Sequence, residues 1–244
     1  MEEKERGSIL ISKKWYKRWW AIVGFCFVGI IILFSPLYIY QVYKVYHQMK
    51  AGGYLTVEDL SREAPYSMDY IVNSMSPWKG NEAAEIQIVE FGDFNCSRCL
   101  QAFNIMRELE GKYHDKIKFY WRNYPVVSGS SIEMAKGGVC AHQQGKFWLY
   151  HDRMFQLQGQ INEENLAETV QTFGLDKKKF EDCLVNDLTL AQIKKDYFAA
   201  KEGEVSGTPT FFINGYKLQG VVPLTNWIDV VEKFLAIYEN NAGN

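Results

Sequence analysis

The chain has 244 residues, of which 47% are hydrophobic and 23% charged, with a formal net charge of −2 at pH 7. From Val45 onward it carries 20 Lys and Arg against 26 Asp and Glu, a net charge of −6. This balance argues against a nucleic-acid-binding protein, which needs a clustered basic face.

Residues 19–40 predict one transmembrane helix. They are free of charge and rich in Ile, Val, Phe and Leu, long enough to cross a hydrocarbon core of about 30 Å at roughly 1.5 Å per residue. Tryptophans and tyrosines stand at both ends, as in the aromatic belts of membrane proteins. The basic residues cluster before the segment, at Lys13, Lys14, Lys17 and Arg18. The positive-inside rule therefore predicts a cytoplasmic segment over residues 1–18 and a domain outside the membrane.

A cleaved signal peptide is the alternative interpretation of this segment. Its apolar core is long for a signal peptide, and no Ala-X-Ala cleavage site follows it. Residues 41–69 then form a linker containing Gly52-Gly53 and Pro65, with an edge strand expected near 70–74.

Two cysteines stand at a predicted junction between a strand and a helix. The apolar run over 86–91 predicts a strand, and Gly92-Asp93 turns the chain. After Cys99, apolar residues recur at steps of three and four, which is the stripe of an amphipathic helix. Cys96 thus lies at the start of a helix, where unpaired N–H groups and the helix dipole favour a thiolate.

The spacing Cys96-Ser97-Arg98-Cys99 predicts a reversible dithiol switch. Arg98 adds a cation that should lower the pKa of Cys96 further. Cys99, one turn into the helix, should be more buried and act as the resolving thiol. Half of a metal site is the alternative, but no second Cys-X-X-Cys motif and no histidine pair at ligand spacing accompanies it, so we expect no metal.

Two residues distant in sequence favour the redox interpretation. Glu90 lies on the apolar strand, where burial would raise its pKa and let it exchange a proton with Cys99 through water. A solvent-facing Glu at a strand edge is the other possibility. Pro209 follows Thr208 and precedes a strand; if their bond is cis, it forms a sharp corner that could face Cys96.

The remaining elements follow in a simple order. Residues 117–121 predict a second strand, and residues 131–201 have helical patterns with their own start signals. Strands at 210–213 and 217–221 flank Asn214-Gly215, a strong hairpin signal. A last helix should run over 224–238.

In this order the motifs resemble the DsbA family of thiol-disulfide oxidoreductases. The resemblance covers about residues 70–240 and is carried by four runs, at 89–99, 144–148, 150–152 and 207–215. It implies an α/β fold, thioredoxin-like with an inserted α-helical domain and here preceded by one N-terminal transmembrane helix. The thioredoxin-like domain would comprise 70–127 and 202–244, and the helical insert 128–201.

The resemblance also implies roles for single residues. Cys96 would be the exposed nucleophile, Cys99 the resolving cysteine and Glu90 the buried acid, while Thr208 and the cis-proline Pro209, together with Ser97, would meet an extended substrate. Where well-known oxidases of the family carry Pro-His, this chain has Ser97-Arg98, which leaves its redox strength open. A quinone-linked membrane partner would reoxidise the enzyme, and no bound organic cofactor is implied.

Cys140 and Cys183 lie in the predicted helical insert. Because exported cysteines usually pair, we expect a structural disulfide that closes a loop of about 40 residues. Two buried free thiols, or a second redox pair, are the alternatives.

These observations predict a membrane-anchored, extracytoplasmic enzyme, on the periplasmic or cell-surface side, that introduces or exchanges disulfide bonds in exported proteins with cysteines. The same site could instead serve a membrane-tethered thiol reductase or a disulfide isomerase. A hypothesis of a different class is a peptide-binding chaperone module whose cysteines are only structural.

Overall fold

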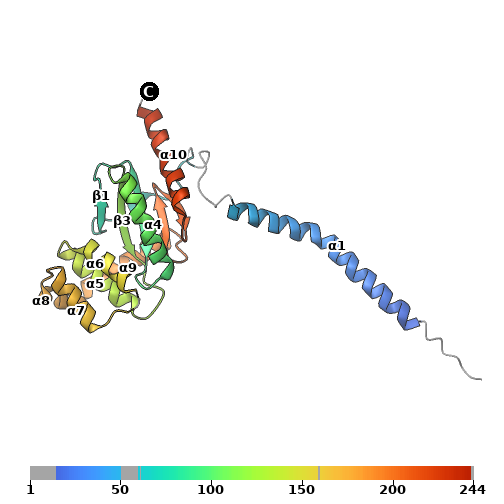
Figure 1. The fold of residues 1–244 in the computed structure, drawn as a ribbon, viewed down its shortest axis with the longest axis horizontal. Helices are drawn as coiled ribbons and strands as arrows, with labels where there is room; N and C mark the ends of the chain where they lie inside the picture. The colour runs from blue at the N-terminus through green and yellow to red at the C-terminus, as the bar shows by residue number, and fades with distance from the viewer. Residues whose placement is uncertain (1–14, 51–59, 61, 159, 243–244) are drawn as a thin grey trace, which may run out of the picture. The chain divides into compact units, whose positions relative to one another are not determined.

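The computed structural model describes residues 15–50, 60, 62–158 and 160–242. It divides into two units, residues 1–53 and 54–244, each described by itself (Figure 1). Of the predicted cytoplasmic segment 1–18, residues 1–14 lie outside the described residues, as do 51–59 and 61 of the predicted linker.

The first unit contains one helix, α1 (Trp15–Lys50), which extends beyond the predicted 19–40 at both ends. Its stretch Ile22–Tyr43 is long and apolar enough to cross a membrane. The apolar side chains described along this stretch are exposed.

The second unit is built on one five-stranded sheet in the order β1-β3-β2-β4-β5. Strands β2 (Ile86–Gly92) and β3 (Ile117–Asn123) are parallel neighbours, and their residues are almost all buried. Strands β4 (Thr210–Ile213) and β5 (Tyr216–Gln219) form the expected hairpin and pair antiparallel. The short β1 (Trp78–Gly80) pairs antiparallel with β3 at the other edge.

The expected strand at 70–74 was wrong. The chain forms a short helix there, α3 (Met68–Ile71), whose N-cap Ser67 accepts a hydrogen bond from the backbone N–H of Asp69 at 3.3 Å. The edge strand comes later, at β1, and ends at Gly80, which has a φ of +94° and lies close against the Ile117 carbonyl.

Helices cover both faces of the sheet. On one face α4 (Ser97–Tyr113) and α10 (Leu224–Ala242) bury a core that includes Ile86, Ile88 and Phe211. On the other, α3 and the end of α9 (Asp187–Glu202) pack against Val89, Phe91 and their neighbours. Since side chains alternate along a strand, Glu90 projects to the same face as Ile86 and Ile88, under α4.

Five helices lie between β3 and β4 and gather at one end of the sheet (Figure 1). They are α5 (Ser131–Gln143), α6 (Phe147–Leu157), α7 (Glu163–Thr172), α8 (Lys177–Leu184) and α9. The apolar side chains of α5, α6, α7 and α8 share one buried cluster with Cys99, Phe103 and Trp121. The insert is therefore part of the surroundings of the two cysteines.

Candidate active site

The loop after β2 sets Cys96 at the start of α4. Cys96 is the N-cap residue, with extended backbone angles, and its N–H donates to the Asp93 carbonyl at 3.0 Å. The Asp93 carboxylate is buried and accepts from the N–H groups of Asn95, Val126 and Val127, each at 2.9 Å. Asp93 thus ties the cysteine loop to the loop after β3. The sequence analysis treated Asp93 only as a turn residue, since its partners Val126 and Val127 are more than 30 positions away.

The two thiols occupy different surroundings. Both are free, and Cys99 is fully buried. Cys96 is only 7% exposed, which differs from the exposed nucleophile that the resemblance implied. The Cys99 thiol, the Thr208 side chain and the backbone N–H groups of Cys99 and Arg98 stabilise the Cys96 thiolate against burial, lowering the pKa of Cys96 to about 5. Burial raises the pKa of Cys99, so it stays protonated. One sulfur is therefore a stable thiolate at neutral pH and the other a thiol.

Arg98 acts on Cys96 through its backbone N–H, which differs from the expected role of its side-chain charge. Its guanidinium is exposed, as is the neighbouring Ser97.

Glu90 lies beneath this helix start. It is 2% exposed and sits on a strand between β3 and β4, opposite Trp121 and Phe211, so it is not at a strand edge. One carboxylate oxygen, Oε1, has no hydrogen-bond partner. Burial raises the pKa of Glu90 well above its usual range; Lys79 opposes this, and the charges of Cys96 and Glu110 add to it. Glu90 and Cys99 also couple electrostatically, since the Glu90 charge contributes to the raised pKa of Cys99.

Lys79 and Glu110 belong to the same surroundings, although sequence reasoning missed both. Lys79 Nζ lies 2.8 Å from Glu110 Oε2 and 4.3 Å from the centroid of the Trp148 ring. The pair comes from β1 and α4, two elements that only the fold brings together. A correct assignment of the edge strand at 78–80 would have been the signal for Lys79.

The turn before β4 faces the cysteines. The Thr208-Pro209 bond is cis, and the Cys96 thiol is 3.4 Å from the Thr208 carbonyl oxygen. Beside this turn lies a hollow of about 160 Å³, whose lining is formed by Arg98, Ser206, Gly207, Thr208, Pro209, Thr210, Gln219 and Gly220. The chain thus brings together Cys96, Cys99 and Glu90 from one segment and Thr208-Pro209 from another.

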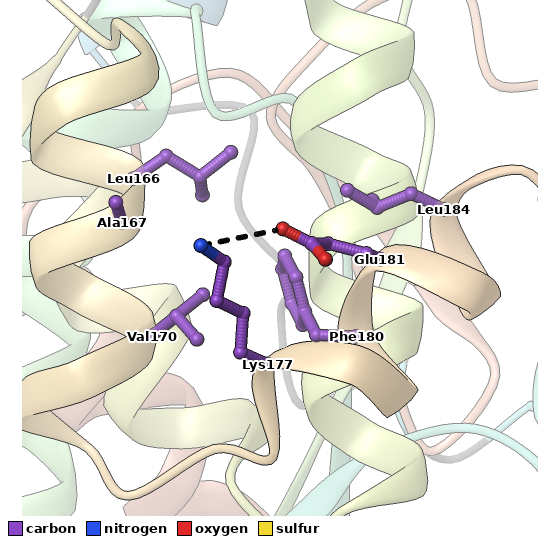
Figure 2. Close-up of a pocket in the computed structure, with 7 residues that line it drawn as sticks. All are labelled: Leu166, Ala167, Val170, Lys177, Phe180, Glu181 and Leu184. Atoms are coloured by element: carbon purple, nitrogen blue, oxygen red, sulfur yellow. Dashed lines mark ion pairs between the residues drawn. The ribbon is translucent and has the colours of Figure 1, made fainter.

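Cys140 and Cys183 are joined to each other. Their sulfur atoms are 2.03 Å apart in a disulfide that links α5 to α8. A hollow of about 360 Å³ lies in the insert. Figure 2 shows the ion pair of Lys177 and Glu181 among the apolar side chains that line it, and Lys177 Nζ is 3.8 Å from Glu181 Oε1. None of the predicted site residues lines it.

A family model described as thioredoxin matches residues 72–233. The chain belongs to the thioredoxin family. Within that family its fold is that of DsbA proteins. It matches the thiol-disulfide exchange protein α-DsbA2 of Wolbachia pipientis with a TM-score of 0.63 and 24% identity, over 68% of this chain and 90% of the other. It matches oxidised BdbD of Bacillus subtilis with a TM-score of 0.61 and 20% identity, over 66% and 94%.

Two curated relatives of this thioredoxin-family chain are matched over very different shares of their own length. A Na(+)/H(+) antiporter NhaA 1 of Salinispora arenicola is 33% identical over 144 residues, 58% of this chain and 22% of the antiporter. The chain thus spans about a fifth of the antiporter's length. A probable disulfide bond formation protein D of Bacillus anthracis is 27% identical over 148 residues, 56% of this chain and 68% of that protein.

Proposed function

We propose that this chain is a membrane-anchored, extracytoplasmic thiol-disulfide oxidoreductase that introduces or exchanges disulfide bonds in exported proteins. The observation that carries the proposal is the contrast between Cys96 and Cys99. A thiolate with a pKa of about 5 is a good leaving group, and a buried thiol one turn away can close the disulfide again. The names of the relatives in Wolbachia and Bacillus support the same chemistry.

In the oxidising direction the Cys96–Cys99 disulfide is the oxidant. A substrate thiolate attacks Cys96 Sγ, the Cys96–Cys99 bond breaks, and Cys99 leaves as a thiolate that takes up a proton. We assign the supply of that proton to Glu90, acting through water, because burial raises the pKa of Glu90 and its Oε1 has no hydrogen-bond partner. A second substrate thiolate then attacks the substrate sulfur of the mixed disulfide, and Cys96 leaves as a thiolate. The substrate loses two electrons and the enzyme gains them.

Substrate binding follows from the turn at Thr208-Pro209. We assign the Thr208 backbone to pairing with an extended substrate segment, a mode in which main-chain hydrogen bonds give affinity. Ser97 and Pro209 would border the segment. Reoxidation needs an electron acceptor, which we assign to a quinone-linked membrane partner.

The α1 helix fits the proposed location. We propose that residues 19–40 span the membrane with residues 1–18 in the cytoplasm, that 41–69 are a linker, and that 70–127 and 202–244 with the insert 128–201 lie outside. The basic residues before the apolar stretch support this orientation. The Cys140–Cys183 disulfide supports an oxidising compartment, where structural disulfides persist.

The reduction potential of the Cys96–Cys99 pair tests the direction. We expect a value near −120 mV, about that of a strong oxidant, because a stabilised Cys96 thiolate favours the reduced form. Equilibration of the purified chain with glutathione buffers, followed by alkylation and mass measurement, gives the potential. A value close to −270 mV would assign the chain to the reductases instead. Slow alkylation of Cys96 at pH 6 would favour the chaperone module with structural cysteines.

A further inference from the structure

Arg98 occupies a position that does not serve the stability of its helix. It lies in the first turn of α4, and this turn holds no acidic residue. A cation at a helix N-terminus is unfavourable, because the dipole makes that end positive. Within the described residues the exposed Arg98 side chain forms no ion pair. The sequence thus places an unneutralised guanidinium two positions after Cys96, where it is available to a ligand.

The hollow beside the Thr208-Pro209 turn has one charged side chain in its lining, and that is Arg98. Three other donor groups of the lining already have partners. Gln219 Nε2 donates to Ser206 Oγ at 2.9 Å, the Thr210 hydroxyl donates to the Gly207 carbonyl at 2.7 Å, and the Gly220 N–H donates to the Pro209 carbonyl at 2.8 Å. The guanidinium is left with free donors facing a polar hollow.

The position of the hollow ties it to the reacting sulfur. Thr208 belongs to its lining, and the Thr208 carbonyl oxygen is 3.4 Å from the Cys96 sulfur. A substrate whose cysteine is joined to Cys96 must therefore carry its neighbouring residues past this hollow. The Cys96 thiolate is stabilised by Cys99, Thr208 and backbone N–H groups, which leaves the Arg98 guanidinium for another role.

We propose that Arg98 binds an acidic side chain next to the reacting cysteine of the substrate, and so makes the site select acid-flanked cysteines. This inference rests on the proposed exchange function and names its substrate class. Guanidinium and carboxylate form charge-assisted, commonly bidentate hydrogen bonds, which adds geometric selectivity to the attraction. The chemical step is unchanged: the substrate thiolate forms a bond to Cys96 Sγ while the Cys96–Cys99 bond breaks and Cys99 takes up the proton.

Matched peptides test the selection. Each reduced peptide has one cysteine. Glu, Gln or Lys occupies either the position before that cysteine or the position after it. The oxidised full-length chain in neutral detergent is mixed with each peptide, and the rate of enzyme disulfide opening is divided by that peptide's rate with hydroxyethyl disulfide. This ratio removes the effect of the flanking residue on the intrinsic reactivity of the peptide thiol.

We expect the Glu peptide to react about 5- to 10-fold faster than the Lys peptide for at least one position at low salt, and the preference to shrink in 0.5 M NaCl. Arg98→Gln should reduce it to within about twofold, Arg98→Glu should invert it, and Arg98→Lys should keep part of it. The net charge of −6 after Val45 would favour the Lys peptide, so overall charge cannot mimic the result.

Lys116→Gln is the matched control, because it removes one exposed positive charge just before β3, at the opposite end of the sheet. It should leave the Glu preference unchanged. Equal rates for Glu and Lys peptides with the unaltered chain, or a preference that survives Arg98→Gln, would overturn the selection by Arg98 while leaving the exchange function intact. Failure of every peptide to open the enzyme disulfide would instead refute the proposed function.

Discussion

Two cysteines three positions apart acquire different chemistry from their immediate surroundings. Cys96 is the N-cap residue of a helix, and hydrogen bonds from Cys99, Thr208 and backbone N–H groups favour its thiolate. Cys99 is enclosed by apolar side chains. The sequence motif predicted this division, because the first position of such a helix faces the unpaired N–H groups and the fourth lies one turn inside. It did not predict that the Cys99 thiol is the largest stabilising influence on Cys96.

The Cys99 thiol should therefore set the acidity of Cys96. In a Cys26→Ser background the reduced chain should react with iodoacetamide at Cys96 with a midpoint near pH 5. Replacing Cys99 by Ala removes the thiol hydrogen bond, so the midpoint should rise by at least one pH unit toward the ordinary value of about 8.5. The pH dependence of alkylation measures both midpoints. An unchanged midpoint in Cys99→Ala would contradict this account.

Burial of Glu90 should cost stability at neutral pH. A carboxyl whose pKa is raised on folding contributes stability below its unfolded pKa of about 4.3 and loses that stability as the pH rises through its folded pKa. Glu90→Gln should thus stabilise the reduced chain at pH 8 by about 1 kcal/mol or more, since each pKa unit corresponds to about 1.4 kcal/mol. The same change should slow disulfide exchange about 10- to 100-fold by removing the proton donor.

Urea unfolding at pH 5 and pH 8, together with peptide exchange rates, measures both effects. Glu82→Gln is the matched control, since Glu82 is exposed, and it should alter stability by no more than about 0.5 kcal/mol. Loss of stability at pH 8 on replacing Glu90 would argue against a costly buried charge.

Among the elements, the insert helices α5 and α6 pack closely where Tyr150 of α6 lies against Gly137 of α5. A Cβ there would lie 2.2 Å from the Tyr150 hydroxyl oxygen, and that hydroxyl donates to the Met134 carbonyl at 3.0 Å. Gly137→Ala should destabilise the domain by about 1–3 kcal/mol, because the buried Tyr150 ring must shift. Gly111→Ala, in α4 with open space around it, should instead stabilise by about 0.5–1 kcal/mol. Denaturant midpoints compare the two, and equal effects would refute the packing argument.

The Cys140–Cys183 disulfide joins α5 to α8 across 43 positions of sequence. A cross-link of this length restricts the unfolded chain, so replacing both cysteines by Ala should cost about 2–4 kcal/mol of stability. Chemical denaturation of the oxidised chain and of the double variant measures the difference. If the pair were a second redox centre, the double variant would also lose electron transfer at Cys96–Cys99, whereas a structural bond predicts unchanged exchange with peptides.

At the scale of the whole molecule, the apolar α1 stretch should hold the chain in the membrane, and the folded domain should lie in the aqueous phase. The intact chain should remain with membranes after high salt and alkaline carbonate washes, and residues 54–244 alone should be released into solution. In intact cells with Cys26→Ser, a membrane-impermeant maleimide should label reduced Cys96. Labelling that requires cell lysis would reverse the proposed orientation.

The sequence by itself determined the elements whose signals are local. These elements are the dithiol at a helix start, the apolar stretch over 19–40, the hairpin at Asn214-Gly215 and the strands and helices in their order. Each rests on a pattern of residues that are contiguous in the sequence. The burial of Glu90 was predicted for the same reason, since Glu90 stands on an apolar strand. The prediction of the edge strand was wrong because the true strand has only three residues. Their pattern is too short to outweigh the apolar residues near Tyr70.

Only the tertiary structure decided what meets the cysteines. The cis turn at Thr208 reaches Cys96 from 112 positions away, Asp93 fixes the loop through Val126, and Lys79 comes within the field of Glu90 from an edge strand. These contacts depend on strand order and on the packing of α4 over the sheet, which no local pattern encodes. Desolvation, which sets the protonation of Glu90 and Cys99, exists only once that packing has formed.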